Sequence, residues 1–172
     1  MTVWHCHIAV SLDGKIARVD GSFDWLMAYP PQEFGFDAFA AGRDAVVMGR
    51  ATYETERAMG AWRHPDIPTY VVTSQPLADP PPLVEARAPD FARLAEELEG
   101  RGCRKIGVEG GGQLVRGLVA AGRLDVLEMA LVPLVLGDGI PLFPTGTPEL
   151  PLRLVRCEPR TGGAIHLIYA RN

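Results

Sequence analysis

The chain has few cysteines, and their arrangement suggests neither a disulfide framework nor a metal site. Only Cys6, Cys103 and Cys157 occur among its 172 residues, and no two of them form a CxxC pair. An odd number of widely spaced cysteines is typical of reduced thiols in a reducing compartment. The sequence therefore argues against a small secreted domain held together by disulfide bonds.

Long hydrophobic runs are also missing. The longest apolar stretch, Val126 to Leu136, is interrupted by Glu128 and Pro133 and is too short to span a membrane. The N-terminus has no basic segment followed by an apolar one, so no secretory signal is expected. We therefore expect a cytoplasmic protein with no membrane partner.

Positive charge is not in excess. The formal net charge is −4, which argues against a general nucleic-acid partner, because such proteins usually carry a basic face. The chain is 47% hydrophobic and 22% charged, a composition that favours a packed core over disorder. With no internal repeat and no long linker, the length predicts a single domain over residues 1–172.

Strand-like and helix-like patterns alternate along the chain. Short apolar runs predict six strands, at Val3–Val10, Ala45–Met48, Thr69–Thr73, Leu83–Ala86, Lys105–Glu109 and Val126–Val132. Helical periodicity predicts helices at Gln32–Ala41, Ala51–Ala58 and Phe91–Leu98. A fourth helix is predicted after the triple glycine, with Leu114, Val115, Leu118 and Val119 as its buried stripe and Gly122 as its C-cap. Two final strands, 152–157 and 164–170, flank a glycine turn that suits a hairpin. The pattern predicts an α/β fold with a mixed, mostly parallel sheet, helices on both faces and a C-terminal antiparallel hairpin.

The first of two glycine corners lies between a strand and a helix, at Met48 to Glu54 (MGRATYE). Gly49 lets a ligand approach the backbone, and the next helix offers free N–H groups and the positive end of its dipole. Arg50 adds a permanent cation that suits a phosphate. The same residues also fit an ordinary turn glycine followed by a surface arginine.

The second corner carries three successive glycines, Gly110 to Gly112, between a strand and a helix. No side chain there would obstruct a pyrophosphate, although the usual GxGxxG dinucleotide fingerprint is absent. Consecutive glycines are costly in conformational entropy, which favours an anion site over a merely flexible loop.

These corners resemble a known family. MGRATYE is similar to the MGRxTWE turn of dihydrofolate reductase, and the triple glycine is similar to the second cofactor loop of that enzyme. Ser11 to Ala17 (SLDGKIA), Asp20 to Leu26 (DGSFDWL) and Glu109 to Gly111 resemble the reductase half of the bifunctional riboflavin-biosynthesis deaminase–reductase. The resemblance runs from about residue 3 to the C-terminus and implies a three-layer dihydrofolate-reductase-like fold.

The resemblance also implies an oxidoreductase that transfers hydride from NADPH to a small organic substrate, as dihydrofolate reductase and 5-amino-6-(5-phosphoribosylamino)uracil reductase do. It implies that backbone groups of Ala9 and Ile16 hold the nicotinamide edge, and that Arg50 and Ser74 lie near the 2′-phosphate. The residues implied to cradle the pyrophosphate are Gly49, Arg50, Ala51, Thr52, Gly110, Gly111, Gly112, Gln113 and Leu114.

The substrate side differs from that family. The riboflavin reductase carries a lysine where this chain has His7, and an acid–acid–proline stretch where this chain has Glu54 to Arg57. The zinc signature of the deaminase is absent. The acceptor is therefore expected only as a class, pterin-like or pyrimidine-like. A homodimer is a further implication of the resemblance, with Val126 to Leu136 either in the interface or buried within one subunit.

Hydride transfer also requires a proton source, because a hydride alone leaves the acceptor one proton short. Three carboxylates are candidates, Glu33, Asp37 and Asp13, since a carboxylate in a closed apolar pocket can have a pKa raised enough to act as an acid. Glu33 and Asp37 lie one turn apart on a predicted helix and equally fit a solvated helix face. Asp13 equally fits a turn in which its side chain bonds to nearby backbone. Trp25 and the loop Val135 to Gly139 are expected near the pocket.

Two other interpretations remain open at this point. His5 and His7 on one strand face, with His64 and His166 elsewhere, would allow a metal site, although zinc sites usually show tighter ligand pairs. We expect no metal. A non-catalytic nucleotide-binding or sensor protein would keep the glycine corners and lack working polar groups opposite the nicotinamide.

Overall fold

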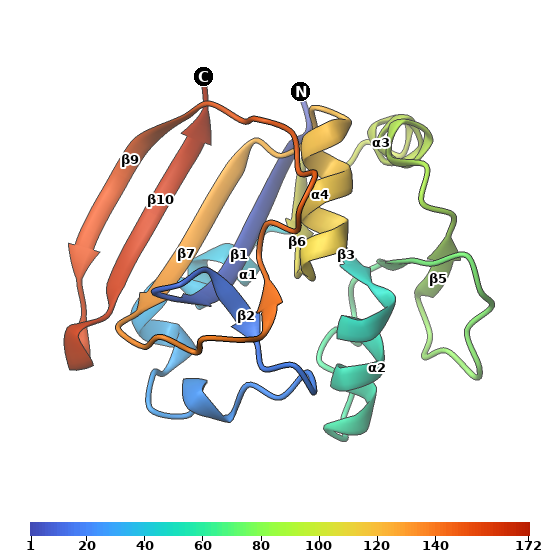
Figure 1. Cartoon of the computed structure of the whole chain (residues 1–172). Coiled ribbons are helices and arrows are strands. Elements are labelled where there is room, and N and C mark those ends of the chain that lie inside the picture. Colours follow the sequence, from blue (N-terminus) through green and yellow to red (C-terminus); the bar gives the residue numbers. More distant parts are fainter.

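The computed structural model describes all residues from Met1 to Asn172 and is built around one eight-stranded sheet (Figure 1). The strand order is β5-β4-β3-β6-β1-β7-β10-β9. The strands are β1 (Val3–Ser11), β3 (Ala45–Gly49), β4 (Thr69–Val72), β5 (Val84–Arg87), β6 (Lys105–Val108), β7 (Val126–Val132), β9 (Leu152–Pro159) and β10 (Ile165–Arg171). The helices are α1 (Phe36–Ala40), α2 (Arg50–Ala58), α3 (Phe91–Gly100) and α4 (Gly112–Ala120).

β10 is the one strand of this sheet that runs opposite to the other seven. β1 pairs in parallel with β6 and β7, and β3 pairs in parallel with β4 and β6. β10 pairs antiparallel with both β7 and β9. The predicted mixed, mostly parallel sheet with an antiparallel C-terminal hairpin is confirmed.

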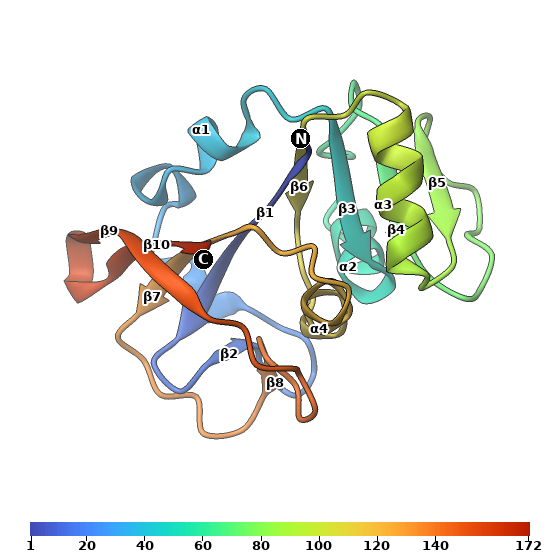
Figure 2. The ribbon, with the colours of Figure 1, turned by 90° about the horizontal axis from the view of Figure 1, so that it is seen from above.

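The alternation of side chains along β1 places helices on both faces of the sheet. Trp4 and Cys6 are fully buried on the face covered by α3 and α4, in one cluster with Leu98 and Leu118. His5 and His7 face the other way and pack against Phe39 of α1. Figure 2 shows α1 and α4 on opposite sides of β1. Strand periodicity in the sequence thus determines which side chains reach the core.

The segment predicted as one helix from Gln32 to Ala41 is broken in two. A 3₁₀ turn spans Pro31–Phe34, and α1 begins only at Phe36. Gly35 separates them with a left-handed φ of +77°. A Cβ built at Gly35 would lie 2.7 Å from Glu128 Oε1, so the backbone passes directly over this buried carboxylate. The predicted single helix is wrong because packing against a distant strand overrides the local periodicity.

A second, two-stranded sheet was not predicted. β2 (Lys15–Ala17) pairs antiparallel with β8 (Ile140–Pro141) and lies beside the start of α4. A Cβ on Gly112 would collide with the Pro141 carbonyl oxygen, so this glycine allows the close approach. Each strand is two or three residues long, too short to show a period in the sequence.

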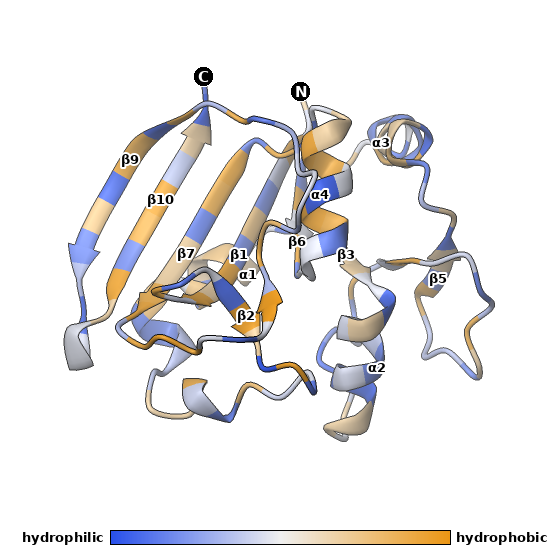
Figure 3. Cartoon of the chain, in the orientation of Figure 1, coloured by the Kyte–Doolittle hydropathy of each residue, from blue (hydrophilic) through white to orange (hydrophobic).

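β7 lies inside the subunit, because both of its edges are paired, with β1 and with β10. Its backbone therefore offers no free edge for an interface, and of the two places expected for Val126 to Leu136, burial within one subunit fits this strand. The free edge on this side of the sheet is β9, beyond β10, where Leu154 and Val155 are exposed. Figure 3 shows hydrophobic colour along most of β7 and alternating colour along β9.

No helix has both the length and the apolar character needed to cross a bilayer.

The contact between α3 and α4 gives a test of this packing. A Cβ on Gly117 would overlap the ring of Phe91, so we expect Gly117→Ala to lower the free energy of unfolding by about 1–3 kcal/mol. Gly100→Ala is the matched control, because no atom lies within 4 Å of its added Cβ. We expect the control to be neutral or about 0.5 kcal/mol more stable. Urea denaturation measures both, and equal stabilities would contradict this packing.

Candidate active site

Three adjoining cavities lie at the carboxyl ends of β1, β3 and β6, where open α/β sheets usually bind ligands. The glycine cavity, of about 690 Å³, lies between the two glycine corners. The α2 cavity, of about 250 Å³, lies between the end of β1 and helix α2. The aromatic cavity, of about 350 Å³, includes Phe23, Tyr29, Phe34 and Phe36 in its wall. Shared lining residues, such as Ala51 and Ala9, make the three one continuous cleft.

The two glycine corners lie side by side because their backbones bond to each other. The Gly49 N–H donates to the Gly110 carbonyl at 2.9 Å, and the Glu109 N–H donates to the Val47 carbonyl at 3.1 Å. A Cβ on Gly49 would lie 3.5 Å from the Gly111 nitrogen, so little room remains between the turns. The peptide bond between Gly110 and Gly111 is cis. Two turns that are 60 residues apart in the sequence thus form one surface.

Helices α2 and α4 both begin at this surface without a side-chain cap. Their N-cap residues are Gly49 and Gly111, neither of which has a side chain that could accept a hydrogen bond. By contrast, the Asp90 side chain caps α3 by accepting from the Arg93 N–H at 3.1 Å. Uncapped first turns leave N–H donors and positive dipole ends free for an anion. Two such turns in one cavity suit a ligand with two linked phosphates.

Most of the predicted cofactor residues line this cleft. The glycine cavity is lined by Gly49, Arg50, Ala51, Gly111, Gly112, Gln113 and Leu114. The α2 cavity is lined by Ala9, Ile16, Ala51, Thr52, Gly110 and Gly111. Ser74 lines neither cavity and is exposed in the loop after β4.

Arg50 faces the loop that contains Ser74. Its Nη1 lies 3.2 Å from the Pro76 carbonyl and 3.4 Å from Thr73 Oγ1, while its Nε bonds to Glu54 Oε1 at 2.7 Å. The Glu54 carboxylate and the loop carbonyl therefore orient a half-exposed guanidinium at the rim of the glycine cavity.

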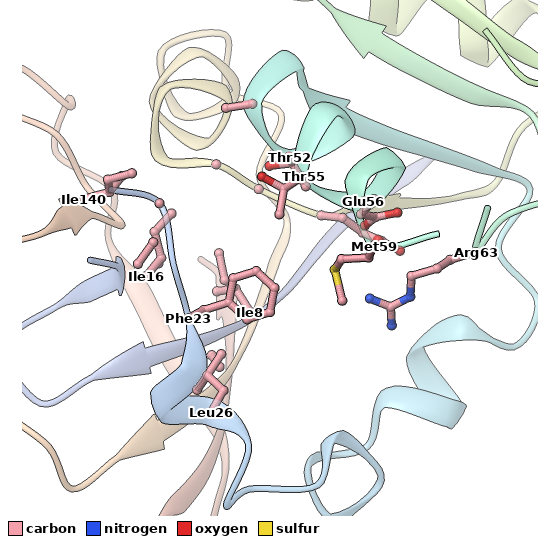
Figure 4. Close-up of a pocket in the computed structure, with 17 residues that line it drawn as sticks. Ile8, Ile16, Phe23, Leu26, Thr52, Thr55, Glu56, Met59, Arg63 and Ile140 are labelled. Atoms are coloured by element: carbon pink, nitrogen blue, oxygen red, sulfur yellow. The ribbon is translucent and has the colours of Figure 1, made fainter. Parts of the chain in front are cut away.

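One face of α2 forms a wall of the α2 cavity. Thr52, Thr55, Glu56 and Met59 have the i, i+3, i+4, i+7 spacing of a helix face, and Figure 4 shows them on the same side of the cavity. Ile8, Ile16, Phe23 and Leu26 form the facing apolar wall. Trp25, expected near the pocket, is buried and lines none of the three cavities, although Phe23 and Leu26 line two of them.

A buried group of four charged side chains lies at the end of this wall. We call Arg43, Glu56, His64 and Glu109 the Glu109 cluster. His64 Nε2 lies 3.2 Å from Glu56 Oε2 and 3.2 Å from Glu109 Oε2. Arg43 Nη1 pairs with Glu109 Oε1. Both carboxylates belong to residues that line the α2 cavity, whereas His64 and Arg43 lie behind them.

Arg43 reaches this cluster across β6 because Gly107 has no side chain. A Cβ on Gly107 would collide with Arg43 Cδ. The guanidinium also lies 4.9 Å from the centre of the Phe39 ring, and its Nε donates to the Ala40 carbonyl at 3.2 Å. The position of the cation is therefore fixed by a strand glycine and by α1.

The cluster shifts the pKa values of its members. Burial alone would lower the pKa of His64, but the close contacts of its ring with the negatively charged Glu109 and Glu56 raise it to about 9. Burial would raise the pKa of Glu109, but His64 and Arg43 outweigh it and hold that pKa below its usual range. At neutral pH the cluster therefore contains an imidazolium, a guanidinium and an ionised Glu109.

No sequence motif marks these four residues as one cluster. Glu56 was noted only within the segment that departs from the riboflavin reductase, and His64 only as one of several histidines. The spacing of Thr52, Glu56 and Met59 was a usable signal, because it places Glu56 on the α2 face that follows the first glycine corner. The pairing of His64 with Glu109 had no local signal.

Asp13 has a structural role. Its carboxylate accepts hydrogen bonds from Ser11 Oγ at 2.7 Å, from the Leu136 N–H at 3.0 Å and from the Gly137 N–H at 2.9 Å. These bonds, the one from Ser11 first, lower its pKa to about 2, so it holds no proton at neutral pH. Asp13 thereby fixes the loop Val135 to Gly139, which delivers Ile140 to the wall of two cavities.

Glu33 and Asp37 lie outside the cleft and line none of the three cavities. Asp37 is exposed. The expectation that they share one helix face is wrong, because the chain breaks at Gly35 between them.

The four histidines do not converge on one point. His5 Nε2 lies 2.8 Å from Glu128 Oε2, and His166 Nε2 lies 2.6 Å from Glu128 Oε1. His7 Nε2 instead bonds to the backbone carbonyl of Phe34 at 2.7 Å. The remaining histidine lies in the Glu109 cluster. The four histidines therefore do not form one shared site.

The Glu109 cluster predicts a pH dependence of stability. The pKa of His64 is about 9 in the folded protein, against an ordinary value of 6.5. The folded state thus binds this proton more tightly than the unfolded state does. The contribution of protonated His64 to the unfolding free energy is therefore complete below about pH 6.5 and is lost as the pH rises through about 9. We expect the unfolding free energy to fall by on the order of 2–3 kcal/mol over this window. Urea denaturation across this pH range should show that His64→Gln lacks the decline; equal slopes would contradict the assignment.

Comparison with known proteins places the chain in a family. The RibD C-terminal domain family matches residues 4–166. YwjB, an uncharacterised protein of Bacillus subtilis (strain 168), is 36% identical over 171 residues, which cover 96% of this chain and 95% of YwjB. A crystal structure from Shewanella sp. PV-4, of a protein provisionally assigned to riboflavin biosynthesis, superposes with a TM-score of 0.89 at 24% identity and covers 99% of both chains. Dihydrofolate reductase from Enterococcus faecalis, complexed with NADP(H), has a TM-score of 0.69 at 21% identity, covering 99% of this chain and 96% of that one. The chain belongs to the RibD C-terminal domain family and has the dihydrofolate-reductase-like fold.

Proposed function

We propose that this protein is an NADPH-dependent reductase that transfers hydride to a small pterin-like or pyrimidine-like substrate. The observation that carries the proposal is the pair of uncapped helix starts in the glycine cavity, next to a cavity walled by two carboxylates. Membership of a family named for a reductase domain, and the fold shared with a reductase that binds NADP(H), support it.

The residues of the cleft fit the parts of this cofactor. The first turns of α2 and α4 would hold the pyrophosphate through backbone N–H groups. Arg50, with Ser74 in the facing loop, would hold the 2′-phosphate that distinguishes NADPH from NADH. Ala9 and Ile16, which line the adjoining α2 cavity, would flank the nicotinamide. When bound there, the cofactor supplies a hydride.

The substrate would occupy the α2 and aromatic cavities. Glu56 and Glu109 can accept hydrogen bonds from amino, ring N–H or hydroxyl groups, which pterins and aminopyrimidines carry. Aromatic walls suit a flat ring. The Arg63 guanidinium lines both cavities and forms no salt bridge, so it favours a substrate with an acidic substituent.

Cofactor titration tests the assignment of Arg50. We expect the purified protein to bind NADPH at least about tenfold more tightly than NADH, a difference of about 1.4 kcal/mol. Binding is followed by quenching of Trp4, Trp25 and Trp62 fluorescence. Arg50→Ala should remove most of this preference, because it removes the cation at the rim of the glycine cavity.

Arg57→Ala is the matched control, since Arg57 lies on the same helix, is exposed and forms no salt bridge. It should keep the preference for NADPH. Binding of neither nucleotide by the wild type would overturn the proposed function.

Turnover is tested separately, by the loss of NADPH absorbance in the presence of pterins and flavin precursors. Oxidation of NADPH with at least one acceptor supports the reductase. Tight binding without turnover across the panel would favour the non-catalytic nucleotide sensor instead.

We also propose that two copies associate through the β9 edge. An unpaired edge strand offers free backbone N–H and C=O groups, and Leu154 and Val155 on β9 are 55% and 53% exposed. Light scattering should give the mass of a dimer for the wild type and of a monomer for Leu154→Arg. Val19→Arg changes a residue elsewhere that is more exposed, at 68%, and this variant should remain a dimer. A monomeric wild type would contradict the interface.

A further inference from the structure

We propose that His64 holds the proton that reduction of the substrate consumes, and that it releases this proton to the α2 cavity through Glu56 and Glu109. The proposal rests on the proposed reductase function and concerns a group that does not itself reach the cavity. His64 is thus a positioning residue, because it acts through the two carboxylates.

The geometry gives His64 two acceptors of equal distance. Its Nε2 lies 3.2 Å from one oxygen of Glu56 and 3.2 Å from one oxygen of Glu109. The Nε2–H group is buried and aligned with neither oxygen as in an ordinary hydrogen bond. The proton therefore points between two carboxylates, and a small rotation of either side chain completes a bond to one or the other. Both carboxylates line the α2 cavity.

Charge balance favours a proton at this position. Around His64, Arg43 contributes one positive charge, and Glu56 and Glu109 contribute two negative charges. Trp62, from the same loop as His64, adds only an aromatic edge with ring centres 5.2 Å apart. A neutral imidazole would leave one buried negative charge unbalanced, and a divalent cation would leave an excess positive charge. An imidazolium gives zero net charge, the least costly state for a buried group.

The carboxylates singled out in the sequence and the histidine of the aromatic cavity hold no suitable proton. Asp13 is ionised and bound to backbone, and Glu33 and Asp37 lie outside the cavities. His7 lines the aromatic cavity, but burial lowers its pKa and its Nε2 is bonded to the Phe34 carbonyl. Among these carboxylates and histidines, His64 is the group that both carries a proton at neutral pH and contacts two carboxylates of the α2 cavity; its raised pKa supports this.

The proton balance of the reduction is complete with this group. Reduction of a C=O or C=N bond adds a hydride to carbon, which the cofactor supplies, and leaves oxygen or nitrogen in need of one proton. His64 Nε2 releases a proton to Glu56 or Glu109, and that carboxyl group passes it to the oxygen or nitrogen. The N–H bond of the imidazolium breaks and a new O–H or N–H bond forms on the product. Solvent then returns one proton to His64.

Nitrogen NMR of the full-length, ¹⁵N-histidine-labelled protein tests where the proton lies, without any substrate. We expect both ring nitrogens of His64 to give imidazolium shifts at pH 7.5 and to lose them only near pH 9. Glu56→Gln should bring that transition to lower pH, because it removes one of the two acceptor charges. Zn²⁺ or Mn²⁺ should leave the signals unchanged. A neutral His64 at pH 7.5, or a shift on adding either cation, would overturn the proposal.

His64→Gln tests the transfer, because glutamine keeps an N–H donor but carries no charge and no transferable proton. With an acceptor found in the turnover screen, we expect kcat to fall at least about tenfold. The Kd for NADPH should stay within about twofold, since His64 lies outside the glycine cavity. Wild-type kcat should also decline as the pH rises through about 9, and the variant should lack this decline.

His5→Gln is the matched control, because it removes another histidine that is paired with a buried glutamate, and it should retain wild-type kcat. If His64 is shown to be charged and the kcat of His64→Gln is unchanged, the charge of His64 serves only stability, and the proposal is overturned. If none of the acceptors tested leads the wild type to oxidise NADPH, the proposed function fails. The NMR titration still decides where the proton lies, because it needs no substrate.

Discussion

The end of β6 has to satisfy two opposite electrostatic demands within four residues. Gly110 to Gly112 and the start of α4 form a surface for anions, because their N–H groups are free. Glu109, immediately before them, directs a carboxylate toward the adjoining cavity. An uncompensated carboxylate at this place would repel a phosphate and would be costly to bury. The buried cations Arg43 and His64 remove this conflict, and much of the surrounding structure serves to hold them there.

That requirement explains features of the fold that are far from the cleft. Because Gly107 has no side chain, Arg43 can cross β6 at this residue. Helix α1 places the Phe39 ring and the Ala40 carbonyl against the guanidinium. On the other side, Trp62 packs its ring against His64, and its Nε1 donates to the His64 carbonyl at 3.0 Å. Arg43 thus lies in the loop before β3 and His64 in the loop before β4, whereas Glu56 belongs to α2 and Glu109 directly follows β6.

The parts of the structure that the sequence predicted are those that local patterns encode. The alternation along β1 and the glycine corners after β3 and β6 depend on neighbours within a few residues, and they were located correctly. The break at Gly35 depends on Glu128, 93 residues away, and the pairing of His64 with Glu109 spans 45 residues. No periodicity records such contacts. Predicted cofactor residues therefore fell largely in the cleft, while the carboxylates chosen as proton donors did not.

The protein contains two buried clusters in which histidine pairs with glutamate, one around Glu128 and one around Glu109, and comparing them separates structure from function. Glu128 lies between His5 and His166 under the break at Gly35, and neither Glu128 nor His166 lines any of the three cavities. Glu109 has similar partners and similar burial, yet it forms part of the cavity wall. A buried histidine–glutamate pair is therefore not by itself a sign of chemistry in this fold. Access of the carboxylate to a cavity is the distinguishing property, and it locates the proton chemistry at the end of β6 rather than within β7.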